Sequence, residues 1–274
     1  MPRLLPTLAL LCLAALPSLT AQPALQPGEA FTYRVSWGLL GKVGEINVSE
    51  QSGATPDVSS IAVNTRTSGL ARLLFPFEGT ARSFFDRDDG QLLRASASTK
   101  SRRKSTEASI VFDYEAAQTR YTDHLNPRRD TVLALPGEPP LELITSLIRA
   151  RDYNLKPGEA RTVSVLFDDE IYELRLRAGD YETIETADGK VSALRVTPEP
   201  VGEPKGMFKR GGAIRVWLAD DAGRLPVRLE VELKVGTAVA LLTEHSAPPA
   251  PVETAMVSPT TPGPHTPPPP AGRL

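Results

Sequence analysis

The chain has 274 residues, of which 41% are hydrophobic and 23% are charged, a composition that is ordinary for a globular protein. Its 31 basic and 33 acidic residues give a formal net charge of -2. A net charge so close to zero provides no field that would attract nucleic acid or an anionic membrane surface, so we expect no nucleic-acid partner.

The N-terminus has the form of a secretory signal. One basic residue, Arg3, precedes a short Leu/Ala-rich stretch that ends near Pro17, and the small residue Ala21 follows at a plausible cleavage position. We therefore predict a signal peptide over residues 1–21, cleavage before Gln22 and a periplasmic location, with no transmembrane span after signal removal. An uncleaved anchor is the alternative, although the apolar stretch is short for a membrane span.

The only cysteine, Cys12, lies within this predicted signal. Leu11 precedes it, where a lipoprotein signal would have a small residue. The predicted mature chain therefore has no thiol and no disulfide, and its stability must come from a hydrophobic core.

Hydrophobic residues alternate along most of the chain between Pro27 and Glu244. This period of two is typical of antiparallel strands with one buried and one solvated face. Turn signals such as "DRDDG", "FDDEI", "TADGK" and "ADDAG" separate the strands. The alternating apolar sets are Phe31, Tyr33, Val35 and Trp37; Ile110, Phe112 and Tyr114; Val163, Val165 and Phe167; and Leu225, Val227, Leu229, Val231, Leu233 and Val235.

One stretch has helical spacing. Leu141, Ile144, Leu147 and Ile148 recur along one side after two prolines, which predicts a helix from about Pro140 to Arg151, packed against the sheet. The stretch "GLARLLFPFEG" is apolar without alternation and indicates a short helical turn or a lip.

These elements predict three regions: a signal peptide over 1–21, a curved all-β domain over 22–245 and a Pro-rich disordered tail over 246–274. Ten of the residues from Pro248 to Pro270 are proline. We expect the tail to be a passive disordered end, with a tether or a ligand for a partner as the alternative. The predicted fold is a single strongly curved antiparallel sheet, an open or spiral-like β-barrel, with one helix packed on its concave face.

With the strands placed, the chain resembles the bacterial exported family catalogued as domain of unknown function 3108. The resemblance rests on "PGEAFTYRVSWGLLGKVGE", "EGTARSFFDRDDGQLL", "LITSLIRARDYNLKPGE" and "AIRVWLADDAGRLPVRLEVELKVGTAVALL", and it covers nearly the whole predicted mature body. It implies a β-rich, signal-bearing envelope protein with no established reaction, and it supplies no catalytic residues to transfer.

Few residues are candidates for chemistry. Asp220 and Asp221 are adjacent, but "DDAG" indicates a hairpin turn in which Gly223 supplies a positive φ. The segment Asp86–Gly90 is similar to the start of a calcium loop. Gln91 and Ala97, however, stand where that loop needs a glycine and a bidentate glutamate. His124 could pair with Asp123 or Asp130, although no nucleophile motif accompanies it. We therefore predict no catalytic residues, no metal site and no cofactor.

Two further stretches could contact a ligand or partner. The basic run "KSRRKS", Lys100–Ser105, is interpreted mainly as protection of a sheet edge, with anion contact as the alternative. Leu70 and Leu73 belong to an apolar run without alternation. From this run, a second one at Met207–Phe208 and the inward faces, we predict a groove lip and lining made of Trp37, Leu74, Phe75, Phe77, Leu147, Phe208 and Trp217.

The resulting hypothesis is a non-enzymatic periplasmic envelope protein that binds a hydrophobic ligand, such as a lipid, an acyl chain or a lipidated envelope partner, in the concavity of its sheet. The first alternative is an interaction or structural module of the envelope with a filled core. The second is an enzyme that acts on cell-wall polymers through an unrecognised set of carboxylates. The sequence leaves the oligomeric state open.

Overall fold

The structure, a computed structural model, describes residues 25–53, 55–203, 208, 212–233 and 236–246. The predicted signal peptide and most of the predicted Pro-rich tail lie outside the described residues. None of the described helices is long and apolar enough to cross a membrane.

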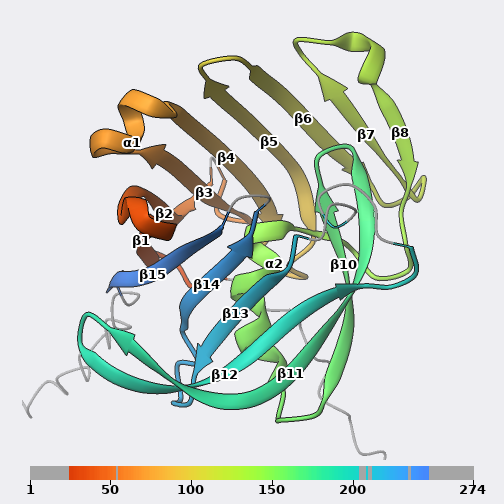
Figure 1. The fold of residues 1–274 in the computed structure, drawn as a ribbon. Coiled ribbons are helices and arrows are strands. Elements are labelled where there is room, and N and C mark those ends of the chain that lie inside the picture. The colour runs from red at the N-terminus through yellow and green to blue at the C-terminus, as the bar shows by residue number, and fades with distance from the viewer. Residues whose placement is uncertain (1–24, 54, 204–207, 209–211, 234–235, 247–274) are drawn as a thin grey trace, which may run out of the picture.

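The described chain forms one 15-stranded sheet (Figure 1). Its elements, in chain order, are β1 (Ala30–Trp37), η1 (Gly38–Leu40), β2 (Lys42–Ser52), β3 (Val58–Thr67), α1 (Gly69–Leu74), β4 (Phe77–Asp86), β5 (Leu92–Ser101), β6 (Ser105–Asp113), β7 (Gln118–Asp123), η2 (Pro127–Arg129), β8 (Thr131–Ala134), β9 (Leu141–Glu142), α2 (Leu143–Arg149), η3 (Ala150–Tyr153), β10 (Ala160–Phe167), β11 (Glu170–Thr186), β12 (Gly189–Pro200), β13 (Ile214–Ala219), β14 (Pro226–Glu232) and β15 (Thr237–Ser246).

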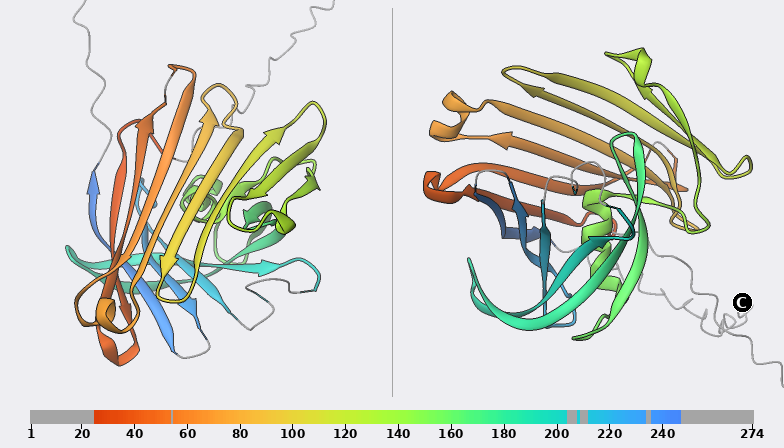
Figure 2. Two further views of the ribbon diagram at one scale, coloured as in Figure 1. Left: turned by 90° about the horizontal axis from the view of Figure 1, so that it is seen from above. Right: turned by 45° about the vertical axis from the view of Figure 1, so that its right-hand side comes forward.

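Two antiparallel meanders build this sheet. Strands β1 to β8 form the first half and β9 to β15 the second, and the halves join where β1 pairs with β15. The pairing is antiparallel throughout, except that the two-residue strand β9 runs parallel to β10. The sheet does not close, because its free edges are β8 and β9. The fold prediction is confirmed: a curved open sheet surrounds one helix (Figures 1 and 2).

The predicted alternation of apolar and polar residues identifies the side chains that form the core. In β1, Phe31 and Tyr33 are 1% and 2% exposed, whereas Arg34, the next residue of the same strand, is exposed. Phe31 and Tyr33 therefore point toward the concave face, to which each strand contributes every second residue.

The helix is shorter than the sequence predicts. Pro140 precedes strand β9 instead of starting a helix, and α2 begins after Glu142. The Glu142 carboxylate accepts hydrogen bonds from the backbone N–H groups of Ile144 (2.9 Å) and Thr145 (2.8 Å), so it supplies the N-cap. After Arg149 the chain tightens into the 3-10 turn η3.

Helix α2 fills the space between the two halves of the sheet. Ile148 belongs to a first core cluster that it shares with Phe31, Val48 and other residues of the first half. Leu147 belongs to a second cluster with Val165, Val216 and other residues of the second half. One helix thus contacts both halves through adjacent side chains.

The longest predicted alternating run, Leu225–Val235, does not stay on one face. A bulge in the pairing of β13 with β14 leaves Val227 in a third cluster with Trp217, while Leu229 packs against the two main cores. Strand β14 also ends at Glu232, and residues 234–235 lie outside the described residues.

Candidate functional site: an apolar cavity in the concave face

The concave face contains an apolar cavity of about 300 Å³. Its floor is the inner face of β4 to β7, and its other wall is the segment from β9 through the start of α2 to the end of β10. The floor is made of Ala81, Ser83, Ala95, Ala97, Ala108 and Ile110; the facing residues include Leu143, Ile144 and Leu166.

Small side chains at matching positions on neighbouring strands leave this space open. Ala81 pairs with Ala97, and Ala97 pairs with Ala108, so three alanines lie side by side across β4, β5 and β6. Nearer the other end of the same strands, Phe85, Leu92 and Phe112 occupy inward positions and fill the first core. The cavity therefore begins where the inward residues change from large to small.

Glu142 lines the cavity, and a buried carboxyl group in an apolar site is a usual candidate for a general acid. Burial raises the pKa of Glu142, although its hydrogen bonds with Thr145 and Ile144 oppose the increase. Both carboxyl oxygens, however, accept hydrogen bonds from the start of α2: one from the Ile144 N–H, the other from the N–H and hydroxyl of Thr145. Glu142 is therefore occupied as a helix cap.

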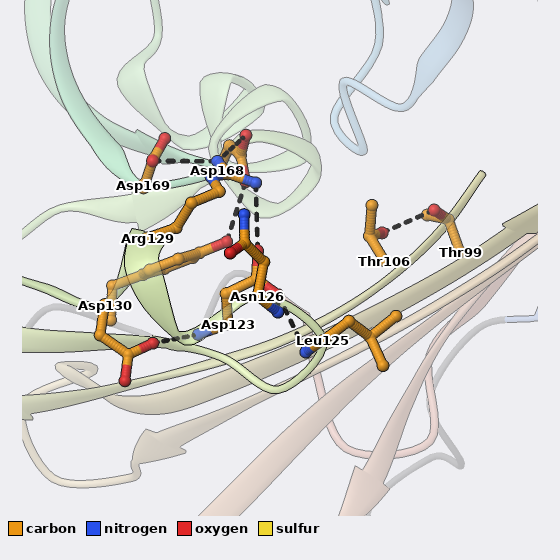
Figure 3. Close-up of polar contacts among 10 residues, drawn as sticks. Thr99, Thr106, Asp123, Leu125, Asn126, Arg129, Asp130, Asp168 and Asp169 are labelled. Atoms are coloured by element: carbon orange, nitrogen blue, oxygen red, sulfur yellow. Dashed lines mark hydrogen bonds and ion pairs between the residues drawn. The ribbon is translucent and has the colours of Figure 1, made fainter.

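A polar clasp spans the free edges of the sheet beside this cavity (Figure 3). Arg129, in η2 of the first half, contacts Asp168 (2.7 Å) and Asp169 (2.9 Å) in the β10–β11 turn of the second half. Arg129 also contacts Asp123 at 3.3 Å. Arg129 thus links the two sides of the open sheet through Asp168 and Asp169, and it also pairs with Asp123 of its own half.

Tyr121 connects the clasp to the cavity wall. Its hydroxyl donates a hydrogen bond to Asp168 Oδ1 (3.1 Å), and the Arg129 guanidinium lies 5.8 Å from the centre of its ring. Burial, with the negative charge of Asp168, raises the pKa of Tyr121. A displacement of the clasp would therefore also move the Tyr121 wall of the cavity.

The carboxylates around the clasp are fixed by the turn that carries them. Asp123 accepts hydrogen bonds from the N–H groups of Leu125 (3.0 Å) and Asn126 (2.8 Å), and Asp130 accepts one from the Asp123 N–H (2.9 Å). Burial alone would raise the pKa of Asp123, but these hydrogen bonds and Arg129 lower it overall. The cluster therefore keeps Asp123 in its charged form.

The predicted lip residues lie together at one end of the sheet, outside the cavity. Leu74 and Phe75 are each 54% exposed at the end of α1, and the Phe75 ring meets the Trp37 ring edge to face at 6.0 Å. Phe77 belongs to the inward row of β4 and lies against Gly79. The predicted short helical turn is confirmed as α1, whereas ligand contact by these four residues stays a prediction.

Two other predicted lining residues are parts of the second core. Leu147 is 5% exposed on α2, and Phe208 is 7% exposed with its ring 6.0 Å from that of Tyr172. Both pack among the residues of the second half. Neither is among the residues that line the cavity.

The prediction that Trp217 lines the groove is wrong. Trp217 lies on the opposite face of β13 from Val216 and Leu218, because adjacent residues of a strand point to opposite sides. Its indole N–H donates to Glu182 (2.8 Å), and the guanidinium of Arg228 covers its ring at 5.2 Å. The apolar side chains of the third cluster, such as Ile184 and Val227, together with these charged neighbours bury this tryptophan on the outer face.

The alanine floor and the clasp are not predicted by the sequence patterns above. The available signal was the small size of residues that alternate along three successive strands. These residues are Ala81 and Ser83, Ala95 and Ala97, and Ala108. Arg129 and Asp168 are 39 residues apart, so no local pattern joins them.

Asp220 and Asp221 lie in the β13–β14 turn, which confirms the hairpin prediction. Asp221 Oδ1 accepts hydrogen bonds from the N–H groups of Gly223 and Arg224, both at 2.9 Å. The positive φ of this turn belongs to Arg224 (44°), not to Gly223 as predicted. The side chain of Asp221 is thus committed to the turn.

Replacing both aspartates, Asp220→Asn with Asp221→Asn, is expected to change the free energy of unfolding by at most about 1–2 kcal/mol, because asparagine also accepts turn hydrogen bonds. Urea denaturation of the purified variant checks the stability, and ligand binding should equal that of the wild type. Loss of binding in a variant of unchanged stability would assign these carboxylates a functional role.

His124 is paired with neither of the carboxylates that the sequence offered. Its Nε2 lies 2.9 Å from Ser109 Oγ on the exposed outer face of the first half. Asp123 is engaged by the clasp, and Asp130 by the Asp123 N–H. In the described residues, no group of three or more His, Cys, Asp or Glu side chains is arranged to hold a metal ion.

The family model described as "Protein of unknown function (DUF3108)" matches residues 32–243, which span β1 to β15. The chain belongs to the DUF3108 family. The family description assigns no activity, and a search of the curated proteins finds no match for this DUF3108 protein.

Solved structures resemble the DUF3108 protein in fold. A beta-barrel-like protein of domain of unknown function DUF1849 from Brucella abortus superposes with a TM-score of 0.50 at 11% identity, over 80% of this chain and 96% of that one. A "putative lipoprotein" from Parabacteroides distasonis has a TM-score of 0.31 at 10% identity, over 82% of this chain and 97% of that one. The first likeness supports the barrel-like architecture and nothing more specific.

Proposed function

We propose that this DUF3108 protein is a non-enzymatic protein of the bacterial cell envelope, located in the periplasm, that binds an apolar ligand such as an acyl chain in the alanine-floored cavity. The observation that carries the proposal is the cavity itself: about 300 Å³ of apolar space between the inner face of β4–β7 and α2. Ligand sites are commonly apolar cavities of this size or larger. The signal-like N-terminus supports the location.

The polar groups near the cavity support binding over catalysis. Both oxygens of Glu142 cap α2, and Asp168 is held by Arg129 and Tyr121. A general acid or base needs a carboxyl group that is free to reach a substrate. The carboxylates of Glu142 and Asp168 are occupied by these hydrogen bonds and instead give the cavity a fixed shape.

The clasp offers a route for ligand entry. The sheet is open between β8 and β9, and Arg129 connects the two sides there through side chains alone. Because no strand pairing crosses this gap, the two sides can separate without breaking the hydrogen-bond ladder of the sheet. The cost is the clasp contacts and the apolar contacts that join Tyr121 to Leu141 and Leu166 in the first core cluster. A chain-like ligand could then enter from the side.

Filling the cavity is expected to weaken ligand binding strongly. In Ala108→Phe, the new ring projects from β6 into the cavity, because Ala108 lines it. We expect affinity for a fluorescent fatty-acid probe to fall by roughly tenfold or more, since the ring occupies the space that the probe needs. Native mass spectrometry of protein purified from the envelope should likewise lose any co-purifying acyl chain.

Ser98→Phe is the matched control. Ser98 is exposed on the neighbouring strand β5, where it bonds the Thr80 hydroxyl at 3.0 Å, and it points to the face opposite Ala97. This variant adds a phenyl ring in place of another small residue, outside the cavity, so it should bind like the wild type. A wild-type protein that excludes the probe and carries no acyl chain would refute the binding function and favour an interaction module.

A further inference from the structure

Three turns meet at one end of the first half of the sheet. They are the β1–β2 turn with η1, the β3–β4 turn with α1, and the β5–β6 turn at residues 102–104 (Figure 1). Phe75 contacts Trp37 at the end of β1, and the Arg102 guanidinium donates to the Leu73 carbonyl at 2.7 Å. The three turns therefore form one continuous surface.

This surface carries a concentration of exposed apolar side chains. Six of the thirteen large hydrophobic residues that are exposed in the described chain lie on two of these turns. We call this set the apolar turn face: Leu39 (108% exposed), Leu40 (50%), Leu70 (79%), Leu73 (70%), Leu74 (54%) and Phe75 (54%). Clustered exposed leucines are unusual on a soluble surface and mark a site of interaction.

Positive charge surrounds the apolar turn face. Residues 68–78 and 100–104 include five basic side chains and one acidic side chain, a local excess of four positive charges in a chain whose net charge is -2. The basic run Lys100–Ser105 belongs to a turn between two interior strands, so its interpretation as edge protection is wrong.

A hollow of about 380 Å³ lies among these cations. Arg72, Lys100 and Arg102 line it together with Phe77 and Glu78, and Glu78 forms an ion pair with Arg72. The three cations exceed the single carboxylate by two charges, and with the Phe77 ring they provide a suitable environment for a phosphate group that is attached to an apolar chain.

We propose that the apolar turn face docks this protein onto the surface of an anionic phospholipid bilayer. The leucines and Phe75 enter the boundary between headgroups and acyl chains, while Arg72, Lys100 and Arg102 contact lipid phosphates. Neither contribution is large alone, and stable attachment to a bilayer commonly requires an apolar anchor together with a basic patch. The proposal is independent of ligand binding in the cavity.

Trp37 provides a built-in reporter. The sequence contains two tryptophans, and Trp217 is 4% exposed on the outer face of the second half. Trp37 instead touches Phe75 of the apolar turn face. Docking in the proposed orientation places Trp37 next to lipid, so quenching of fluorescence by brominated acyl chains reports on Trp37.

The test uses protein purified from the exporting cell and vesicles of phosphatidylethanolamine with phosphatidylglycerol. The wild type should co-sediment with them at physiological ionic strength and show quenching by brominated lipid. Leu73→Glu with Leu74→Glu should weaken co-sedimentation by roughly tenfold or more and remove the quenching. Arg102→Ser with Arg103→Ser should weaken binding to these vesicles but not to phosphatidylcholine vesicles, and added salt should reduce this difference.

Val111→Glu with Val132→Glu is the matched control. These valines are 54% and 50% exposed on β6 and β8, away from the three turns, and the variant shares the same N-terminal segment and tail. It should bind vesicles like the wild type. The proposal is overturned if the wild type stays in the supernatant, if the Leu73/Leu74 variant binds equally well, or if light scattering shows a dimer that this variant dissociates, since a second copy would then cover the face.

Discussion

Arg151→Met is expected to lower the free energy of unfolding by about 3–5 kcal/mol, because it leaves the buried carboxylate of Glu29 without its main partner. The Arg151 and Glu29 side chains are 9% and 4% exposed, and two hydrogen bonds of 2.7 Å join them. His245 also contacts Glu29, at 3.0 Å. Urea denaturation followed by circular dichroism measures the loss.

An exposed ion pair provides the control for this measurement. Arg177 and Glu199 bridge β11 and β12 at 3.2 Å with about half of each side chain exposed, so Arg177→Met should cost less than about 1 kcal/mol. A similar loss in the two variants would show that the Glu29–Arg151 pair contributes no more than a surface contact.

The Glu29–Arg151 pair makes the free energy of unfolding depend on pH. Burial would raise the pKa of Glu29, but the hydrogen bonds from Arg151 and the Gln26 N–H, with the charge of Arg151, lower it overall. A carboxyl group whose pKa is lower in the folded state stabilises the protein above its unfolded pKa, and this contribution is lost as the pH falls through the folded value. The free energy of unfolding of Arg151→Met should therefore fall less steeply with decreasing pH than that of the wild type.

Leu147→Ala is expected to cost about 2–5 kcal/mol, as for a leucine removed from a filled core. Leu147 is 5% exposed and packs with Val165, Leu174 and Val216 of the second half. The surrounding strands are held by sheet pairing and cannot collapse into the space that the side chain leaves. Thermal or urea unfolding of the purified variant measures the cost.

Ile144→Ala provides the comparison on the same helix. Ile144 is only partly buried and faces the cavity, so its removal enlarges an existing space and should cost less than Leu147→Ala. Equal losses would mean that the cavity is as tightly packed as the second core, which would argue against a ligand site there.

The sequence predicted the architecture well where single strands have one buried face. Phe31 and Tyr33 alternate with polar residues and point inward as expected. The predicted helix start was wrong. Pro140 suits a helix N-terminus, but the N-cap is Glu142, whose side chain reaches the first N–H groups of α2 only in the folded geometry.

The candidate site was less predictable. Hydrophobicity suggested that Trp217 faces the groove. Adjacent residues of a strand point to opposite faces, however, and Trp217 lies on the outer face beside Glu182 and Arg228. The cavity depends on Ala81, Ala97 and Ala108 lying in register across three strands. Small residues give no hydrophobic pattern of their own, and register is a property of the folded sheet.

The pairing of β1 with β15 limits when strand pairing can join the two halves of the sheet. These strands are the first and last of the described chain, yet they lie in the middle of the sheet, while the free edges come from the middle of the sequence. The two halves can therefore join only after the last strand has been synthesised, and contacts of such long sequence separation form slowly. For the periplasmic location proposed above, this pairing would form only once the C-terminal strand β15 is available on the same side of the membrane as β1.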